Sequence, residues 1–248
     1  MQALPNIKEQ LASVHPVFRL PSTRVFFYDN VMKKNTRNQL QARILVVASP
    51  GIFLLERKTF PKTLDVSRII PFSELVLITA HNDESLEFFR AKVTMRLQHP
   101  KNAEIVAIVL AIRDALFEDK PRYPKLVLDP EIEKKIESFN YIFETENLIA
   151  ERFISLSLDI PKNEINYDQL SDYFERFKNS KSYFSITSEI IASKYNNPIT
   201  RAIAYDNEIQ TLHLNGLNLS GSLPYLGPII NNNSSIKSTS FSSYTRSL

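Results

Sequence analysis

The stretch Lys101–Phe117 (KNAEIVAIVLAIRDALF) carries apolar side chains around almost the whole circumference of a helix. Ile105, Ile108, Val109 and Ile112 recur at the i, i+3, i+4, i+7 spacing of one helix face, and the residues between them are mostly apolar as well. A helix that is hydrophobic on every side is normally buried in a core. The sequence therefore predicts one central helix, with the segments before and after it packed around it.

Runs of β-branched and aromatic residues precede this helix, and turn signals such as Ser49-Pro50-Gly51 separate them. Seven such runs within about 75 residues predict a meander that curls into a barrel or a sandwich, with the helix covering one open end. The polar and basic segment 32–38 is expected to be a loop. The predicted strands cover residues 25–31, 40–48, 52–55, 64–71, 75–79, 86–90 and 92–97.

Amphipathic helical patterns follow the central helix. Asp129-Pro130 is a good helix start, with a capping carboxylate before a proline at the first helical position, and its apolar period runs to Phe143. Further helices are predicted at Tyr167–Phe177 and Ser185–Tyr195. Residues 1–21 are predicted to form an N-terminal extension with one short helix.

The C-terminal part nearly fits the leucine-rich repeat template L-x-x-L-x-L-x-x-N/C-x-L, although Leu217 occupies the asparagine position and Asn218 comes one place late. Because solenoid repeats are stabilised by their neighbours, one or two repeats cannot bury a core. The repeats therefore either pack on the preceding helices or, as we favour, begin a longer protein. The predicted framework is Ile209, Leu212, Leu214, Leu217 and Leu219, and Ile236, Thr239, Phe241 and Tyr244 echo its first four members about 27 residues later.

Composition narrows the functional classes. Hydrophobic residues make up 43% and charged residues 23% of the chain, as in globular proteins. There is no apolar run long enough for a membrane span and no secretory signal pattern. The absence of cysteine excludes disulfides and thiolate metal sites and is compatible with a cytoplasmic protein.

No catalytic constellation is visible. The four histidines (His15, His81, His99 and His213) are scattered, and no nucleophile motif or glycine-rich phosphate loop occurs. We therefore expect a protein that is not an enzyme, with no cofactor, no metal and no catalytic residues.

The first 60 residues are basic. They contain nine lysines and arginines against three acidic residues, a net charge of +6. A local positive field attracts acidic partners such as lipid headgroups or nucleic acid, although a set of solvated loop lysines is the alternative. The aromatic residues in 24–34 fit a barrel core better than a base-stacking platform, so nucleic acid is not expected as a partner.

The order of these parts resembles the N-terminus of the CARMIL family of cytoskeletal scaffold proteins. The local likeness lies in Leu45-Val46-Val47, in Gly51-Ile52-Phe53-Leu54-Leu55, in Ile70-Pro71-Phe72-Ser73-Glu74-Leu75 and in Pro124-Lys125-Leu126. The resemblance implies a pleckstrin-homology-like (PH-like) domain in front of a leucine-rich repeat solenoid. It also implies binding of the first domain to acidic membranes. The actin-capping segment of that family lies far towards the C-terminus and is not present here.

The PH-like resemblance also implies a lipid site. Such domains bind inositol phosphates through a basic loop between the first two strands, with a lysine and an R-x-R pattern. Here position 45 is Leu45, so the second arginine is missing and a bidentate grip on phosphate is lost. We expect weak, charge-driven contact with acidic lipids without headgroup selection. The candidate lipid-binding residues are Lys33, Lys34, Arg37 and Arg43, with Arg57, Lys58 and Lys62 widening the patch.

The sequence thus predicts an α+β protein: a seven-stranded PH-like β-barrel capped by a C-terminal helix, a helical linker, and the start of an α/β leucine-rich repeat solenoid. The predicted boundaries are 1–21 for the extension, 22–120 for the PH-like domain, 121–206 for the linker and 207–248 for the first repeats. The expected function is that of an adaptor linked to the actin cytoskeleton, peripheral to the plasma membrane or cell cortex, with protein partners on the repeats. The alternative is a PH-like domain that only binds protein or caps the solenoid.

Overall fold

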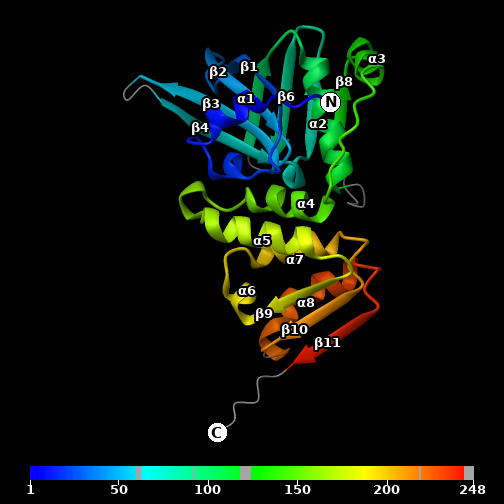
Figure 1. Ribbon diagram of the computed structural model, residues 1–248. Coiled ribbons are helices and arrows are strands. Elements are labelled where there is room, and N and C mark those ends of the chain that lie inside the picture. Colours follow the sequence, from blue (N-terminus) through cyan, green and yellow to red (C-terminus); the bar gives the residue numbers. More distant parts are fainter. Residues whose placement is uncertain (60–62, 92, 118–123, 218, 243–248) are drawn as a thin grey trace.

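The computed structural model describes residues 1–59, 63–91, 93–117, 124–217 and 219–242, and for residues 219–222 it describes the backbone alone. Figure 1 shows three tiers along the molecule. A large sheet with helix α2 (Asn102–Phe117) against it lies at one end, a layer of helices follows, and a small parallel sheet lies at the other end near the C-terminus. The chain is therefore an α+β protein with a large mixed sheet.

The large sheet has eight strands in the order β4-β3-β2-β1-β7-β6-β5-β8. All seven predicted strands occur, and every pairing among these seven is antiparallel. β1 pairs with β2 along its length and with β7 only at Met32 and Lys33, so it joins the two halves of the sheet. The strands are β1 (Val25–Lys34), β2 (Leu40–Ala48), β3 (Gly51–Lys58), β4 (Thr63–Pro71), β5 (Leu77–Ala80), β6 (Ser85–Arg90), β7 (Val93–Gln98) and β8 (Lys125–Leu128).

The eighth strand corrects the predicted seven-stranded barrel. β8 follows α2 and pairs in parallel with β5, with Leu126 opposite Ile78. A four-residue run shows too little period to be recognised as a strand. Among the described residues, β4 and β8 form the two edges and no strand pairing closes the sheet. The two halves nevertheless face each other, because Arg68 Nη1 on β4 donates to the carbonyl oxygen of Thr94 on β7 at 3.1 Å.

Helix α2 is confirmed in its predicted place, and its Ile105, Val109 and Ile112 are fully buried. The N-terminal segment, with helix α1 (Pro5–Leu11) and a 3-10 turn η1 (Pro16–Arg19), is also buried at Leu11, Val17 and Phe18. The rings of Phe18 and Phe53 lie 4.8 Å apart between centroids, so this segment covers the β3 surface that bears Phe53.

Helix α3 (Pro130–Ser138) begins where predicted but is capped differently. Asp129 occupies the N-cap position without a side-chain hydrogen bond to the helix. Its carboxylate instead contacts His81 Nδ1 at 3.1 Å and accepts from the backbone N–H of Asn82 at 2.8 Å. The helix also ends before Phe143, which packs against the sheet.

The middle layer is organised around α4 (Leu148–Ser157), a helix that the periodicity did not separate from its surroundings. Every residue from Ile149 to Ser157 is buried, because α4 contacts α2 on one side and α5 and α7 on the other. The remaining elements of this layer are η3 (Lys162–Glu164), α5 (Tyr167–Asn179), α6 (Ser188–Ala192) and α7 (Asn196–Ala204), while a short turn η2 (Phe72–Glu74) links β4 to β5.

The small sheet is parallel, in the order β11-β10-β9, and consists of β9 (Tyr183–Thr187), β10 (Thr211–Asn215) and β11 (Ser238–Ser242). The predicted helix over 185–195 is therefore wrong at its start. Phe184 and Ile186 are buried and alternate with exposed or half-buried neighbours, which is the period of a strand. The helical part begins only after Thr187, whose hydroxyl caps α6.

Part of the predicted repeat framework forms the core of this small sheet. Ile209, Leu212 and Leu214 are buried and Leu217 is half-buried, whereas the side chain of Leu219 lies outside the described residues. Two of the four echoed pairs lie in register, with Leu212 opposite Thr239 and Leu214 opposite Phe241, and Tyr244 lies outside the described residues. Helix α8 (Leu219–Asn232) connects β10 to β11.

Candidate functional site

Lys33 and Arg43 project from the face of the sheet that turns toward its interior. Val31, which is buried, lies two residues before Lys33 on β1, and residues two apart on a strand share a face. The β1–β2 register pairs Val31 with Arg43 and Lys33 with Gln41. The two cations therefore lie next to each other at the end of β1 and the start of β2.

Arg68 on β4 joins them. The pKa of Lys33 is lowered from its usual value, first by partial burial and then by repulsion from Arg68 and Arg43, while Glu56 acts in the opposite direction. Lys33 thus lies close enough to both arginines to be repelled by them. We call this group, with the neighbouring exposed Lys34 and Arg37, the basic rim.

Arg68 was missed by sequence reasoning. Phe53 packs on Phe18 outside the sheet, so the next residue, Leu54, points to the interior face. The register partner of Leu54 is Arg68, which therefore shares that face. A bulge between Leu54 and Leu55 shifts the β3–β4 register. Because a one-residue shift moves side chains to the other face, alternation along β4 alone could not place Arg68.

Carboxylates neutralise part of the positive charge near the basic rim. Arg43 Nη2 lies 3.3 Å from Glu56 Oε2. Lys58 Nζ lies 2.5 Å from Asp65 Oδ2, and Lys162 Nζ lies 3.2 Å from Asp65 Oδ1. Hydrogen bonds from these two lysines hold the pKa of Asp65 at about 2. An anion arriving here would have to compete with both carboxylates.

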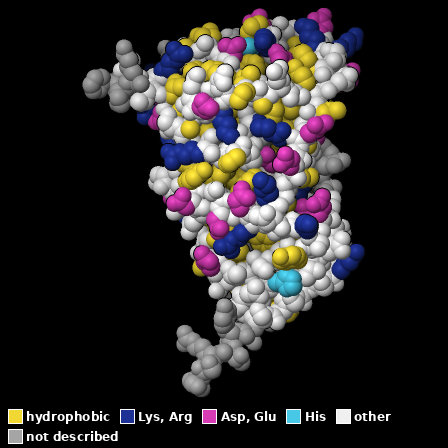
Figure 2. Space-filling model, in the orientation of Figure 1, with side chains coloured by type: hydrophobic (Ala, Val, Ile, Leu, Met, Phe, Trp, Pro, Cys, Tyr) yellow, Lys and Arg dark blue, Asp and Glu magenta, His cyan; other side chains and the backbone are white. Residues whose placement is uncertain are grey.

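The sequence-predicted lipid residues are only partly brought together. Lys33 and Lys34 belong to β1 and not to the expected loop, which shrinks to residues 35–39. Arg37 is exposed in this turn, where its backbone N–H donates to Asn35 Oδ1 at 2.9 Å. Arg57 is exposed on β3, and Lys62 lies outside the described residues. Over the face seen in Figure 2, basic and acidic side chains are interspersed.

The histidines serve local structure. His15 is buried and accepts from the backbone N–H of Val17 through Nδ1, and His99 Nε2 lies 3.4 Å from Asp29. His213 Nδ1 lies 2.6 Å from Ser240 Oγ on the neighbouring strand. Within the described part of the chain, no group of three or more His, Asp or Glu side chains could hold a metal ion.

Comparisons with known proteins add little. No protein-family model and no curated protein matches the chain. Among solved structures, the chain is similar to the N-terminal PH domain of the human ARAP2 protein, at 15% identity and a TM-score of 0.31, over 40% of this chain and 86% of that one. A likeness at this TM-score carries no weight for function. This likeness is to a PH domain and not to a CARMIL protein or a leucine-rich repeat. No helix in the described ranges is long and apolar enough to cross a membrane.

Proposed function

We propose that this chain is a non-enzymatic adaptor that makes weak, non-selective contact with acidic membrane lipids through the basic rim. The observation that carries this proposal is the convergence of Lys33, Arg43 and Arg68 on one face, beside the exposed Lys34 and Arg37. Clustered cations next to an anionic surface contribute about 1 kcal/mol each. Glu56 and Asp65 already pair with neighbouring cations, which favours diffuse attraction over a tight headgroup site.

The fold supports the PH-like interpretation in a limited way. Seven antiparallel strands followed directly by a buried helix form the arrangement that a PH-like domain requires. The added β8 departs from it, and the weak likeness to a known PH domain adds nothing to it. We keep the PH-like domain as part of the proposal.

We also propose that the small parallel sheet begins a leucine-rich repeat solenoid that binds protein partners. Its strands start at Tyr183, Thr211 and Ser238, at intervals of 28 and 27 residues, and leucine-rich repeats are 20–29 residues long. Such a chain would act as a cytoskeletal scaffold peripheral to the plasma membrane or cell cortex. This assignment rests on the resemblance to CARMIL proteins.

The second candidate function is a module that only binds protein or caps the solenoid. The ion pairs of Arg43 with Glu56 and of Lys58 with Asp65 favour it, because they remove free charge from the surface in question.

Co-sedimentation with liposomes separates the two candidates. Neutral, phosphatidylserine-rich and phosphoinositide-doped vesicles are compared at low and at about 0.15 M salt. The test variant is Lys33→Glu/Lys34→Glu/Arg37→Glu. The matched control is Lys125→Glu/Lys134→Glu/Lys135→Glu, which changes the charge equally at exposed positions of β8 and α3.

We expect salt-sensitive binding to both acidic vesicles, lost in the test variant and kept in the control. Equal loss in both variants would show that net charge alone matters and would contradict the assignment to the basic rim. Selective binding to the phosphoinositide vesicles would contradict the non-selective mode. The absence of binding to any vesicle would contradict the lipid-binding function and would support the second candidate, a module that only binds protein or caps the solenoid.

A further inference from the structure

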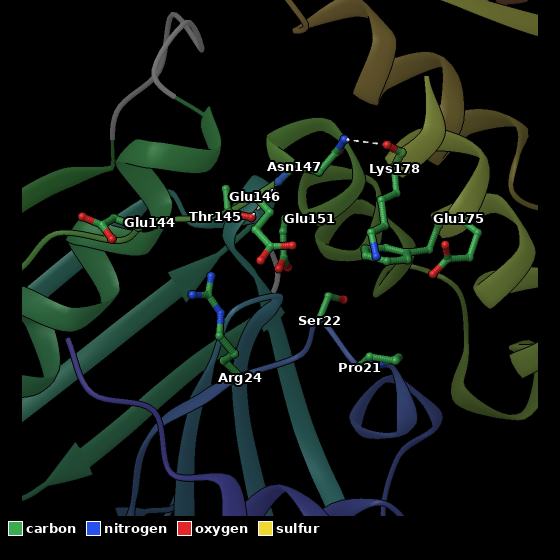
Figure 3. A pocket seen from close by; sticks show the side chains of 11 residues that line it. Pro21, Ser22, Arg24, Glu144, Thr145, Glu146, Asn147, Glu151, Glu175 and Lys178 are labelled. Atoms are coloured by element: carbon green, nitrogen blue, oxygen red, sulfur yellow. Dashed lines mark hydrogen bonds between the residues drawn. The ribbon is translucent and has the colours of Figure 1, made fainter. Parts of the chain in front are cut away.

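A cavity of about 620 Å³ lies between the sheet and the middle layer of helices. Its walls come from four separate parts of the chain: the segment leading into β1, the connector before α4, α4 itself, and α5. Figure 3 shows the side chains of Glu146 and Glu151 pointing toward the space between Arg24 and Lys178, with Glu175 beside Lys178. The volume is typical of a pocket that holds a small ligand.

The charges around this cavity are not paired. It is lined by Glu144, Glu146, Glu151, Glu175, Arg24 and Lys178. Among the described residues, none of these six side chains makes an ion pair, whereas Glu56, Asp65 and Asp159 lie 3.3, 2.5 and 2.9 Å from their cationic partners. With four carboxylates against two cations, an ionised cavity has a net negative charge.

Glu151 is unusual among these groups because its carboxylate is buried without a close counter-ion. It is only 4% exposed, yet the hydrogen bond that its carboxylate receives comes from a neutral hydroxyl, that of Ser49. Burial raises the pKa of Glu151 to about 7, although Arg24 and Lys8 attract the charged form from a greater distance. A buried carboxylate without a close counter-ion is costly, and an incoming cation would remove that cost.

Arg24 is engaged elsewhere and makes no ion pair with Glu151. Its guanidinium lies over the rings of Phe143 and Phe26, at 4.7 and 5.5 Å from the ring centroids. Its Nη2 and the hydroxyl of Ser22 are buried and have no hydrogen-bond partner among the described residues. Both groups can donate, so the wall near Arg24 contains two donors without acceptors, and the wall near Glu151 contains acceptors.

We propose that this cavity binds the basic side chain of a protein segment, with its ammonium or guanidinium group among Glu146, Glu151 and Glu175 and a backbone carbonyl of the same segment near Arg24 and Ser22. A lysine or arginine residue in a peptide carries both the cation and the carbonyl acceptor that these walls lack. A phosphate or carboxylate ligand does not fit, because four carboxylates would repel it. The site lies on different residues from the basic rim, so either can fail without the other.

The test uses the full chain and three probes of defined chemistry. The first is the blocked tripeptide acetyl-Gly-Arg-Gly-amide, the second its neutral citrulline analogue, and the third agmatine, which has the guanidinium without the peptide. Isothermal titration calorimetry gives the affinity of each probe. NMR chemical shifts of the backbone amides in the isotope-labelled protein show where each probe binds. The variants are Glu151→Gln and, on the open side, Glu175→Gln. Glu131→Gln on α3 is the matched control.

We expect the arginine peptide to shift the amides of residues 22–24, 144–151 and 175–178, and to bind roughly tenfold more tightly than the citrulline peptide. Glu151→Gln and Glu175→Gln should each weaken it several-fold, with Glu131→Gln unchanged. Because Glu175 is exposed, its variant keeps the test valid even if Glu151→Gln alters the fold.

Three results would overturn the proposal. The first is equal affinity for the arginine and citrulline peptides, which would show that the positive charge is not recognised. The second is tighter binding of agmatine than of the peptide, which would point to a free amine as the ligand. The third is the absence of shifts around the cavity at saturating peptide.

Discussion

Arg152 Nε donates a hydrogen bond to the carbonyl oxygen of Leu116 at 2.6 Å, inside the core. Leu116 belongs to the last turn of α2, whose carbonyls have no partner within the helix. The same guanidinium also donates through Nη1 to the carbonyl oxygen of Tyr205, directly after α7. One side chain on α4 therefore connects two helix ends by hydrogen bonds. The first is the end of α2, which packs on the large sheet, and the second is the end of α7, which lies nearer the small sheet.

Replacing this side chain should destabilise the whole chain. Arg152→Lys keeps the charge but cannot present two donors in a fork to two carbonyls. Leaving buried carbonyls unsatisfied costs about 1–3 kcal/mol each, so we expect a loss of about 3 kcal/mol in the free energy of unfolding, measured by urea denaturation.

Arg176→Lys is the matched control. Arg176 makes an exposed i,i+4 pair with Asp172 on α5, and such pairs are worth about 0.3–0.5 kcal/mol. Similar losses in the two variants would contradict the fastening role of Arg152.

Gly51 should not tolerate a methyl group. A Cβ built there would lie 2.8 Å from the carbonyl oxygen of Ile70 on β4 and 2.9 Å from Leu158 Cδ1. Gly51→Ala should therefore cost about 1–3 kcal/mol through overpacking. In α8, a Cβ at Gly227 would meet nothing within 4 Å, so Gly227→Ala should be neutral or stabilising by up to about 1 kcal/mol. Thermal denaturation of both variants checks this, and a neutral Gly51→Ala would be inconsistent with the close packing of Leu158.

Glu151 should make the protein less stable as the pH rises. The folded-state pKa of about 7 lies above the ordinary value of 4.5, so between these values the folded protein binds more protons than the unfolded chain. This contribution to stability is full below pH 4.5 and is lost by about pH 7, with a size of order 3 kcal/mol. Glu151→Gln should remove it and be more stable than the wild type above pH 7. The readout is the urea midpoint across this range, and equal pH slopes for both proteins would refute the assignment.

His15 should make the protein less stable as the pH falls, which is the opposite pH dependence from that of Glu151. Burial, followed by repulsion from Lys162, lowers the pKa of His15 from 6.5 to about 4, so here the unfolded chain binds the extra proton. Stability from this group is complete above pH 6.5 and is lost as the pH falls toward 4. His15→Asn retains an oxygen to accept from Val17 N–H but does not titrate. Its stability should fall less steeply than that of the wild type in acid; an unchanged acid limb would exclude His15 as the cause.

The sequence predicted the elements whose pattern is local. Helix α2 and the seven antiparallel strands follow from periodicity and from turn signals such as that at Gly51. It did not predict α4, because Glu151, Arg152, Ser155 and Ser157 interrupt the apolar pattern of a helix that is nonetheless buried all round. These polar groups find their partners on remote segments, and no local window contains that information.

The basic rim was also only partly predictable from the sequence. Basic residues near the β1–β2 connection are visible in the sequence, and two of them, Lys33 and Arg43, lie together. Arg68 and the carboxylates of Glu56 and Asp65 approach them through pairing with β3 and β4 and through a bulge. The cavity around Glu151 is less predictable still, because its walls are far apart in the sequence.

The burial of α4 on every side has a mechanical consequence. Its neighbours include α2, which packs on the large sheet, and α7 in the middle layer, and Arg152 donates hydrogen bonds to the last turn of α2 and to Tyr205 directly after α7. If a flexible linker joined the two sheets, each sheet could move and unfold independently of the other. Here both parts of the chain pack on one buried helix, so we expect the large sheet and the small parallel sheet to move and unfold as one unit.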